Sequence, residues 1–237
     1  MPCRDTSPGA ELFAASALMG YNIVLNRRLP DPAHVPANLA AAGIALGFAR
    51  WQGATTTDLG LSPLHARHGA AWGAAAMVPI IASVAASSAP PPTRALYDDA
   101  RVTGMSGERA AYELLVRIPI GTALAEELIF RGALLGLFRR NHSTLIAVAA
   151  SSALFGLWHV APTLASLRTN AAGRRAAGQP ARMAASVAGV VAITGVAGAA
   201  LAALRLRSSS VLAPILAHVA INSSAFVATR ILAQRAR

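Results

Sequence analysis

Residues 121–138 form an apolar stretch that contains two adjacent glutamates and an arginine. A charged side chain at the centre of a membrane helix costs about 2.5–3.5 kcal/mol on insertion scales, so Glu126, Glu127 and Arg131 together cost roughly 8–10 kcal/mol. A fold that includes this stretch must therefore pair the charges or let them face a wet cavity. Such a segment is a candidate for function as well as for structure.

Helical periodicity separates the two glutamates. At 3.6 residues per turn, Glu127 and Arg131 are i and i+4 on one face, with the acid before the base, whereas Glu126 lies about 100° around the helix. Glu127 and Arg131 can therefore neutralise each other, and Glu126 cannot use the same arginine equally well. The stretch is either a structural ion pair with a spare carboxylate or a site in which Glu126 reacts.

Composition indicates an integral membrane protein. Of the 237 residues, 54% are hydrophobic and 13% are charged, and the mean hydropathy of +0.48 exceeds that of ordinary soluble domains. The net charge is +11, and arginine is the basic residue throughout, clustered between apolar stretches as topology determinants and lipid contacts are. We expect contact with a lipid bilayer and none with nucleic acid. The alanine- and arginine-rich composition further suggests a bacterial protein, hence the inner membrane.

The first ten residues contain no recognisable catalytic or metal-binding motif. A single cysteine, Cys3, excludes an internal disulfide and any zinc site built from cysteines. Residues 1–10 are polar and lack the pattern of a signal peptide, so the first apolar stretch is expected to stay as an anchor.

Alternating apolar stretches and polar connections predict an all-α, polytopic transmembrane bundle of about seven to eight spans. An eighth span arises if the residues before Glu126 cross separately. Small residues in one stretch, Gly189, Gly195 and Gly198, suit close helix packing. Arginines in alternate connections favour a cytoplasmic C-terminus. The seven stretches are residues 12–25, 39–48, 71–89, 121–138, 145–167, 184–204 and 211–232.

A polar, proline-rich stretch near residue 90 divides the chain. We expect residues 1–92 to form an N-terminal membrane-anchor region and residues 93–112 a linker with an interfacial lead-in. Residues 113–237 are expected to form the catalytic region.

Further polar side chains lie within the later apolar stretches. Phe155 and His159 are i and i+4 in one stretch, and His218 and Asn222 are i and i+4 in the last, so the polar ends of each pair project from one helical face. Together with Glu126, they can bring a carboxylate, two imidazoles and a carboxamide into one intramembrane pocket. Phe155 is interpreted as filling space around that pocket.

This set of groups supports hydrolysis. A buried carboxylate can act as a general base towards water, and a nearby imidazole can share the proton. An imidazole and Asn222 can donate hydrogen bonds to a developing oxyanion; alternatively, Glu126, His159 and His218 can hold a divalent metal such as zinc. The chain lacks the compact H-E-x-x-H spacing of zinc proteases, and both mechanisms stay open.

Three short motifs, each on one of the later apolar stretches, resemble those of a known family. The family is CPBP, which includes the type II CAAX prenyl endopeptidases and bacteriocin-immunity or Abi-like membrane proteins. The resemblance covers about residues 113–232, and no motif position departs from the pattern. The motifs are Glu126-Glu127-x-x-x-Arg131, Phe155-x-x-x-His159 and His218-x-x-x-Asn222.

The resemblance implies an all-helical intramembrane protease whose site lies in a cavity open to water or to the cytosolic leaflet. It implies that Glu126 activates the water with His159 assisting, and that the ion pair of the first motif holds the site together. His218 and Asn222 would form the oxyanion hole or help to bind a metal, as in a metalloprotease. Membrane-associated peptides or proteins, including bacteriocin-like toxins, are the expected substrates.

Two functions from other classes are also compatible with the sequence. A non-enzymatic bacteriocin-immunity or scaffold protein would keep the pocket and act by binding. A small transporter would use Glu126 as a proton site, but no second set of buried charges precedes Pro90. The oligomeric state is not indicated by the sequence.

Overall fold

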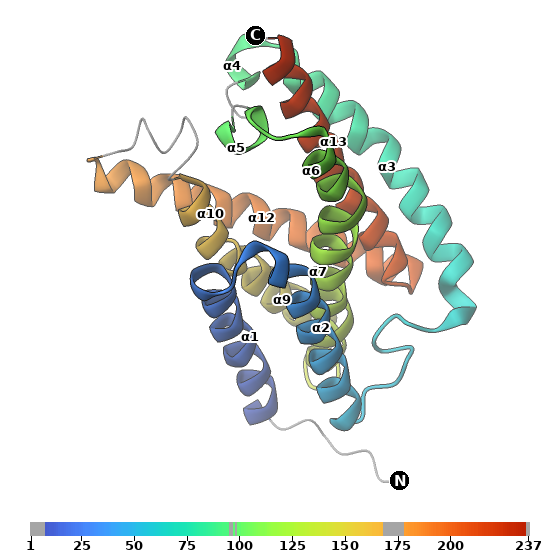
Figure 1. The fold of residues 1–237 in the computed structure, drawn as a ribbon. Helices are drawn as coiled ribbons and strands as arrows, with labels where there is room; N and C mark the ends of the chain where they lie inside the picture. The colour runs from blue at the N-terminus through green and yellow to red at the C-terminus, as the bar shows by residue number, and fades with distance from the viewer. Residues whose placement is uncertain (1–7, 95–96, 98, 168–177, 236–237) are drawn as a thin grey trace.

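The computed structural model describes residues 8–94, 97, 99–167 and 178–235, which are almost entirely helical (Figure 1). The predicted all-helical fold is confirmed, since the described residues form helices and no strand. Cys3, Arg174 and Arg175 lie outside the described residues.

Four of the described helical segments are long and apolar enough to cross a membrane, by length and composition alone. The expected number of seven to eight spans is not established by this criterion. Helix α1 (Pro8–Arg28) illustrates the reason, because Glu11, Asn22 and Asn26 lower the hydropathy of its 21 residues. The four segments are Pro63–Ser88, Thr144–Leu167, Pro180–Ser208 and Leu212–Arg235.

The glutamates lie on a long helical stretch in the middle of the bundle. Two of its parts, η4 and η5, have the wider π-helical hydrogen bonding, which is frequent at functional sites. Pro119 lies within η4 and has no backbone N–H to donate to the helical pattern. The parts in order are α6 (Gly107–Tyr112), η4 (Glu113–Leu124), α7 (Ala125–Glu127), η5 (Leu128–Leu134) and α8 (Leu135–Phe138).

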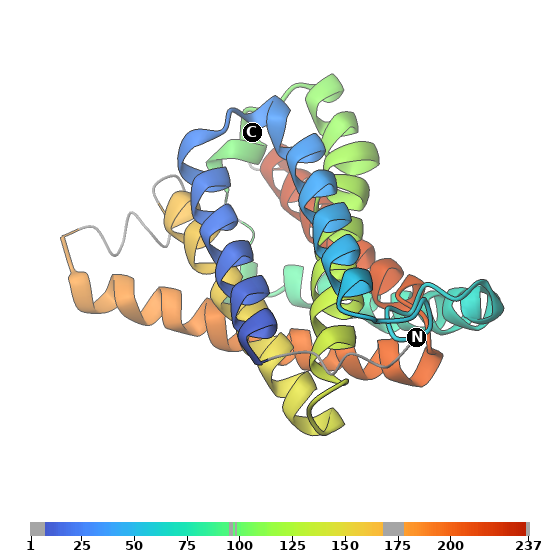
Figure 2. The ribbon, with the colours of Figure 1, turned by 90° about the horizontal axis from the view of Figure 1, so that it is seen from below.

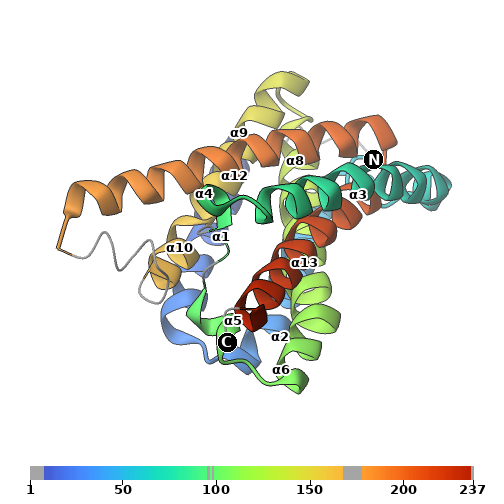
Figure 3. The same cartoon turned by 90° about the horizontal axis from the view of Figure 1, so that it is seen from above.

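Other helices surround this central stretch. Helix α2 (His34–Trp51) packs along η4 and η5, and Figure 2 shows it beside the green ribbon of that stretch. Helices α3 (Ala66–Ser88) and α13 (Leu212–Arg235) run side by side, while α9 (Thr144–Trp158) packs against α12 (Pro180–Ser208) where the two cross (Figure 3). Segments from both halves of the chain therefore enclose the glutamates.

The main core lies where the central stretch meets α9. Phe130 contacts the rings of Phe155 and Trp158 edge-on, with centroid distances of 5.1 and 5.4 Å. These side chains are almost completely buried. The core thus lies directly beside the residues of the first two motifs.

Small residues let α12 approach α9 closely. A Cβ atom at Gly198 would lie 3.1 Å from the Phe155 ring, and one at Gly195 would lie 3.6 Å from the carbonyl oxygen of Ser152. Gly189, expected to pack in the same way, has nothing within 4 Å. The close approach is therefore confined to the part of α12 nearest the motifs.

The connection between α2 and α3 is fastened to α12 by a buried arginine. Arg205 donates from Nη2 to the carbonyl oxygens of Thr57 and Asp58, at 3.1 and 2.9 Å. Gly60 follows with φ +70°, and its carbonyl oxygen accepts from the Val211 N–H at 3.0 Å. A Cβ atom at Gly60 would overlap the Arg205 guanidinium.

Gly60→Ala is expected to lower the melting temperature, because left-handed backbone costs an L-residue about 1–2 kcal/mol and Arg205 must also move. Thermal unfolding of the protein in detergent measures this loss. Gly20→Ala is the matched control, since that position is helical and has nothing within 4 Å. An unchanged melting temperature for Gly60→Ala would contradict the packing described.

Candidate active site

The ion pair expected from the helical spacing is present and fully buried. Arg131 Nη1 lies 2.9 Å from Glu127 Oε1, and the side chains of Arg131 and Glu127 are 1% and 0% exposed. Arg131 also donates from Nη2 to the Gly198 carbonyl oxygen at 3.1 Å, and its guanidinium lies 4.1 Å from the centroid of the Phe155 ring. Arg131 thus joins the central stretch to α12 and stacks on Phe155, the first residue of the second motif.

His218 shares the same carboxylate. Its Nδ1 lies 2.8 Å from Glu127 Oε1, so one oxygen atom accepts from both His218 and Arg131. Because the carboxylate accepts, Nδ1 carries the proton. Glu127 therefore ties α13 to the central stretch.

Glu126 is held by a tryptophan that the sequence reasoning did not assign to the site. Trp158 donates from Nε1 to Glu126 Oε1 at 3.1 Å, and both side chains are buried. The other oxygen, Oε2, has no hydrogen-bond partner among the described residues. One signal was available in the sequence: a buried indole N–H usually finds a partner, and this one belongs to the residue preceding His159.

His159 lies at the break between α9 and α10 (Val160–Leu167). Its Nδ1 is 2.8 Å from the Phe155 carbonyl oxygen. Since a carbonyl only accepts, Nδ1 is protonated and the neutral ring keeps a lone pair on Nε2. The Phe155 ring stands edge-on to His159 at 4.7 Å and to His218 at 6.0 Å, so it fills space between the imidazoles as expected.

A cavity of about 330 Å³ brings Glu126, His159 and Asn222 together. Glu126 comes from the central stretch, His159 from the end of α9 and Asn222 from α13. His218 is not among the residues that line the cavity; it is turned towards Glu127 instead. The remaining lining residues are Asn22, Leu25, Asn26, His34, Val35, Asn38, Arg117, Gly121, Thr122, Trp158 and Pro162.

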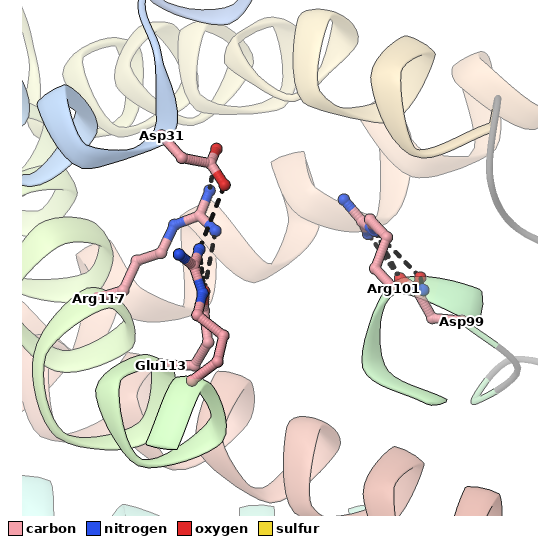
Figure 4. Close-up of polar contacts among 6 residues, drawn as sticks. Asp31, Asp99, Arg101, Glu113 and Arg117 are labelled. Carbon is pink, nitrogen blue, oxygen red and sulfur yellow. Dashed lines mark hydrogen bonds and ion pairs between the residues drawn. The ribbon is translucent and has the colours of Figure 1, made fainter. Parts of the chain in front are cut away.

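Arg117, which lines this cavity, belongs to a cluster of charged side chains. Figure 4 shows Arg117 beside Glu113 and Asp31. Glu113 Oε1 accepts from Arg117 Nη1 at 3.1 Å and from Arg109 Nε at 3.0 Å. Both arginines also approach Asp31, in the turn between α1 and α2, at 3.2 Å from Arg109 and 3.9 Å from Arg117. The first two helices are therefore fixed by charge to the start of the central stretch.

A second ion pair lies nearby, between Asp99 and Arg101 (Figure 4). Burial alone would raise the pKa of Asp99, but hydrogen bonds and the positive charge from Arg101 outweigh it and lower the pKa below its usual value. Arg101 also donates to Ser166 Oγ at 3.1 Å, which links the linker to α10.

Each of the three metal candidates makes a hydrogen bond within the described part of the chain. Glu126 Oε1 is engaged by Trp158, while the Nδ1 atoms of His159 and His218 are engaged by Phe155 and Glu127. Within the part of the chain that the structure describes, no group of three His, Cys, Asp or Glu side chains is placed to hold a metal ion. The neighbouring groups instead form a hydrogen-bonded set around a polar cavity.

Comparison with known proteins identifies the family. Residues 109–224 match the family model described as type II CAAX prenyl endopeptidase Rce1-like, and this segment includes all three motifs. Searches of curated proteins and of solved structures find no match. The matched family and the four apolar helical segments make this an integral membrane protein. The resemblance seen in the motifs is thus confirmed over residues 109–224, which are similar to the Rce1-like type II CAAX prenyl endopeptidase family.

Proposed function

We propose that this protein is an intramembrane endopeptidase that hydrolyses peptide bonds of membrane-associated peptides or proteins, in a bacterial inner membrane. The observation that carries the proposal is the cavity of about 330 Å³ that Glu126, His159 and Asn222 line together. These residues come from segments far apart in the sequence. The family of residues 109–224 supports peptide-bond hydrolysis as the class of reaction.

Glu126 is the general base in this proposal. Trp158 holds Oε1, while Oε2 is buried and has no hydrogen-bond partner in the described residues. Because Glu126 lines the cavity, its carboxylate can take a proton from a water molecule that enters there. The resulting hydroxide attacks the carbonyl carbon of the scissile bond, and a tetrahedral intermediate forms. Its collapse breaks the C–N bond, and the proton held by Glu126 passes to the leaving amine.

His159 assists this proton transfer. With Nδ1–H fixed on the Phe155 carbonyl oxygen, neutral His159 can only accept a proton through Nε2. It lines the same cavity as Glu126 and can therefore orient the water or share its proton.

Asn222 and His218 stabilise the oxyanion in this proposal. Asn222 lines the cavity and can donate from its side-chain amide. The Nδ1–H of His218 is already bound to Glu127, so His218 can donate to an oxyanion only through Nε2–H, as an imidazolium. Glu127 supplies the compensating negative charge, which it also shares with Arg131.

Cleavage of a lipid-anchored peptide by the purified protein in proteoliposomes tests the proposal. His159→Gln is expected to lower kcat by about 10²-fold, because it removes the proton acceptor. Glu108→Gln is the matched control, since Glu108 is exposed on α6 and outside the cavity. Product masses locate the cleaved bond.

Two outcomes would contradict the proposal. One is the absence of cleavage by a folded wild-type protein across a panel of anchored peptides. The other is wild-type kcat in His159→Gln together with Glu126→Gln. The first would favour the non-enzymatic immunity or scaffold function, and the second would place the general base at other residues.

A further inference from the structure

The carbonyl oxygen of Trp158 needs a hydrogen-bond donor from outside its own helix. Helix α9 ends at this residue, and position 162, which would supply the i+4 backbone N–H, is a proline. A buried carbonyl without a partner is destabilising. The end of α9, where Trp158 and His159 lie, therefore depends on another part of the chain.

Asn22 of α1 supplies that donor. Its Nδ2 donates to the Trp158 carbonyl oxygen at 2.6 Å, across 136 positions of sequence. Asn22 is 3% exposed. Asn26 donates to Asn22 Oδ1 at 2.7 Å and to the Asn22 carbonyl oxygen at 2.9 Å, which directs the Asn22 amide N–H towards α9.

The same tryptophan carries the contact to Glu126. Its backbone is fixed by Asn22, its indole N–H donates to Glu126 Oε1, and the next residue is His159. A continuous line of hydrogen bonds thus runs from Asn26 through Asn22 and Trp158 to Glu126.

We propose that Asn22 is a positioning residue for the hydrolytic site, acting through Trp158 on Glu126 and His159. The proposal rests on the proposed function and extends it to a residue outside the family segment 109–224. Asn22 lines the cavity but donates its amide to the protein backbone. Its role is to hold the reacting groups in place.

The experiment uses the full chain in proteoliposomes with a lipid-anchored peptide. Asn22→Asp keeps the side-chain volume and removes the donor, and Trp158→Phe removes the indole N–H. Each is expected to lower kcat about 10- to 100-fold, as small misplacement of reacting groups does, with KM changed less than about twofold. Because both act through one link, the double variant should be little slower than the slower single variant.

Glu11→Gln is the matched control on the same helix. Glu11 is buried near the other end of α1, where its oxygens contact Asn141 Nδ2 at 2.9 Å and His142 Nε2 at 2.8 Å. Weakening these two contacts should loosen the packing of α1 and lower the melting temperature, while kcat stays unchanged. An equal loss of kcat in Glu11→Gln would assign the Asn22 effect to general loosening and overturn the proposal.

Fluorescence separates this proposal from the proposed function. With Trp51→Phe and Trp72→Phe, Trp158 is the remaining tryptophan, and Asn22→Asp should then shift its emission. Wild-type kcat and unchanged emission in Asn22→Asp would overturn the positioning role and leave the protease intact. If Asn22→Asp shifts the emission but the wild-type protein cleaves no peptide, the link is present and the proposed function is contradicted, because the link would then position no reaction.

Discussion

Glu126→Gln is expected to lower kcat for a lipid-anchored peptide by about 10⁴-fold or more, because it removes the general base of the proposed reaction. The glutamine keeps the shape of the side chain and can still accept the Trp158 N–H through Oε1. It cannot take a proton from water. Initial rates in proteoliposomes, with active protein quantified by unfolding in detergent, measure the effect.

The melting temperature of Glu126→Gln shows whether a loss of kcat comes from lost chemistry or from unfolding. Glu126 Oε2 has no partner in the described residues, so replacing the charge should leave the melting temperature equal to or above that of the wild type. If Glu126 and His159 act on the same proton, the double variant should be no slower than Glu126→Gln. A folded Glu126→Gln variant with more than about a tenth of wild-type kcat would refute the assigned base, since general-base effects reach at least 10².

Arg131→Met is expected to destabilise the protein by about 3–5 kcal/mol, the usual loss when one partner of a buried ion pair is removed. Glu127 is fully buried, and among the described residues it would keep only His218 as a partner. The variant also loses the hydrogen bond to the Gly198 carbonyl oxygen and the stacking on Phe155. Chemical unfolding in detergent and the yield of folded protein measure the loss.

The double variant Glu127→Gln/Arg131→Met separates charge from shape. With no buried charge left unpaired, it should recover most of the stability lost in Arg131→Met. It should not recover full activity, since His218 would lose its carboxylate partner. Wild-type stability in the single variant would contradict a buried pair at this position.

Local features of the sequence were sufficient to predict local contacts. The i, i+4 spacing predicted the pairing of Glu127 with Arg131, and the apolar stretches predicted the helices. The helical spacing placed His218 and Asn222 on one face but could not identify the partner of either. In the structure His218 bonds Glu127, whereas Asn222 lines the cavity.

Long-range hydrogen bonds could not be predicted in this way. The Asn22 contact with Trp158 spans 136 positions, and no periodicity or motif links the two residues. The same applies to Asn38 of α2, which donates to the Gly121 carbonyl oxygen at 2.8 Å, across 83 positions. The polar residues of α1 and α2 that line the cavity also lower the hydropathy of these helices, and neither helix is among the four segments apolar enough to cross a membrane.

The hydrogen bonds that α1 and α2 make at the cavity limit how the protein can be engineered. A minimal fragment cut at the borders of the family segment would contain every motif and still lack Asn22 and Asn38. Chimaeras that attach this segment to a foreign membrane anchor should therefore retain the native helical hairpin of α1 and α2, because it carries part of the scaffold that shapes the reaction chamber.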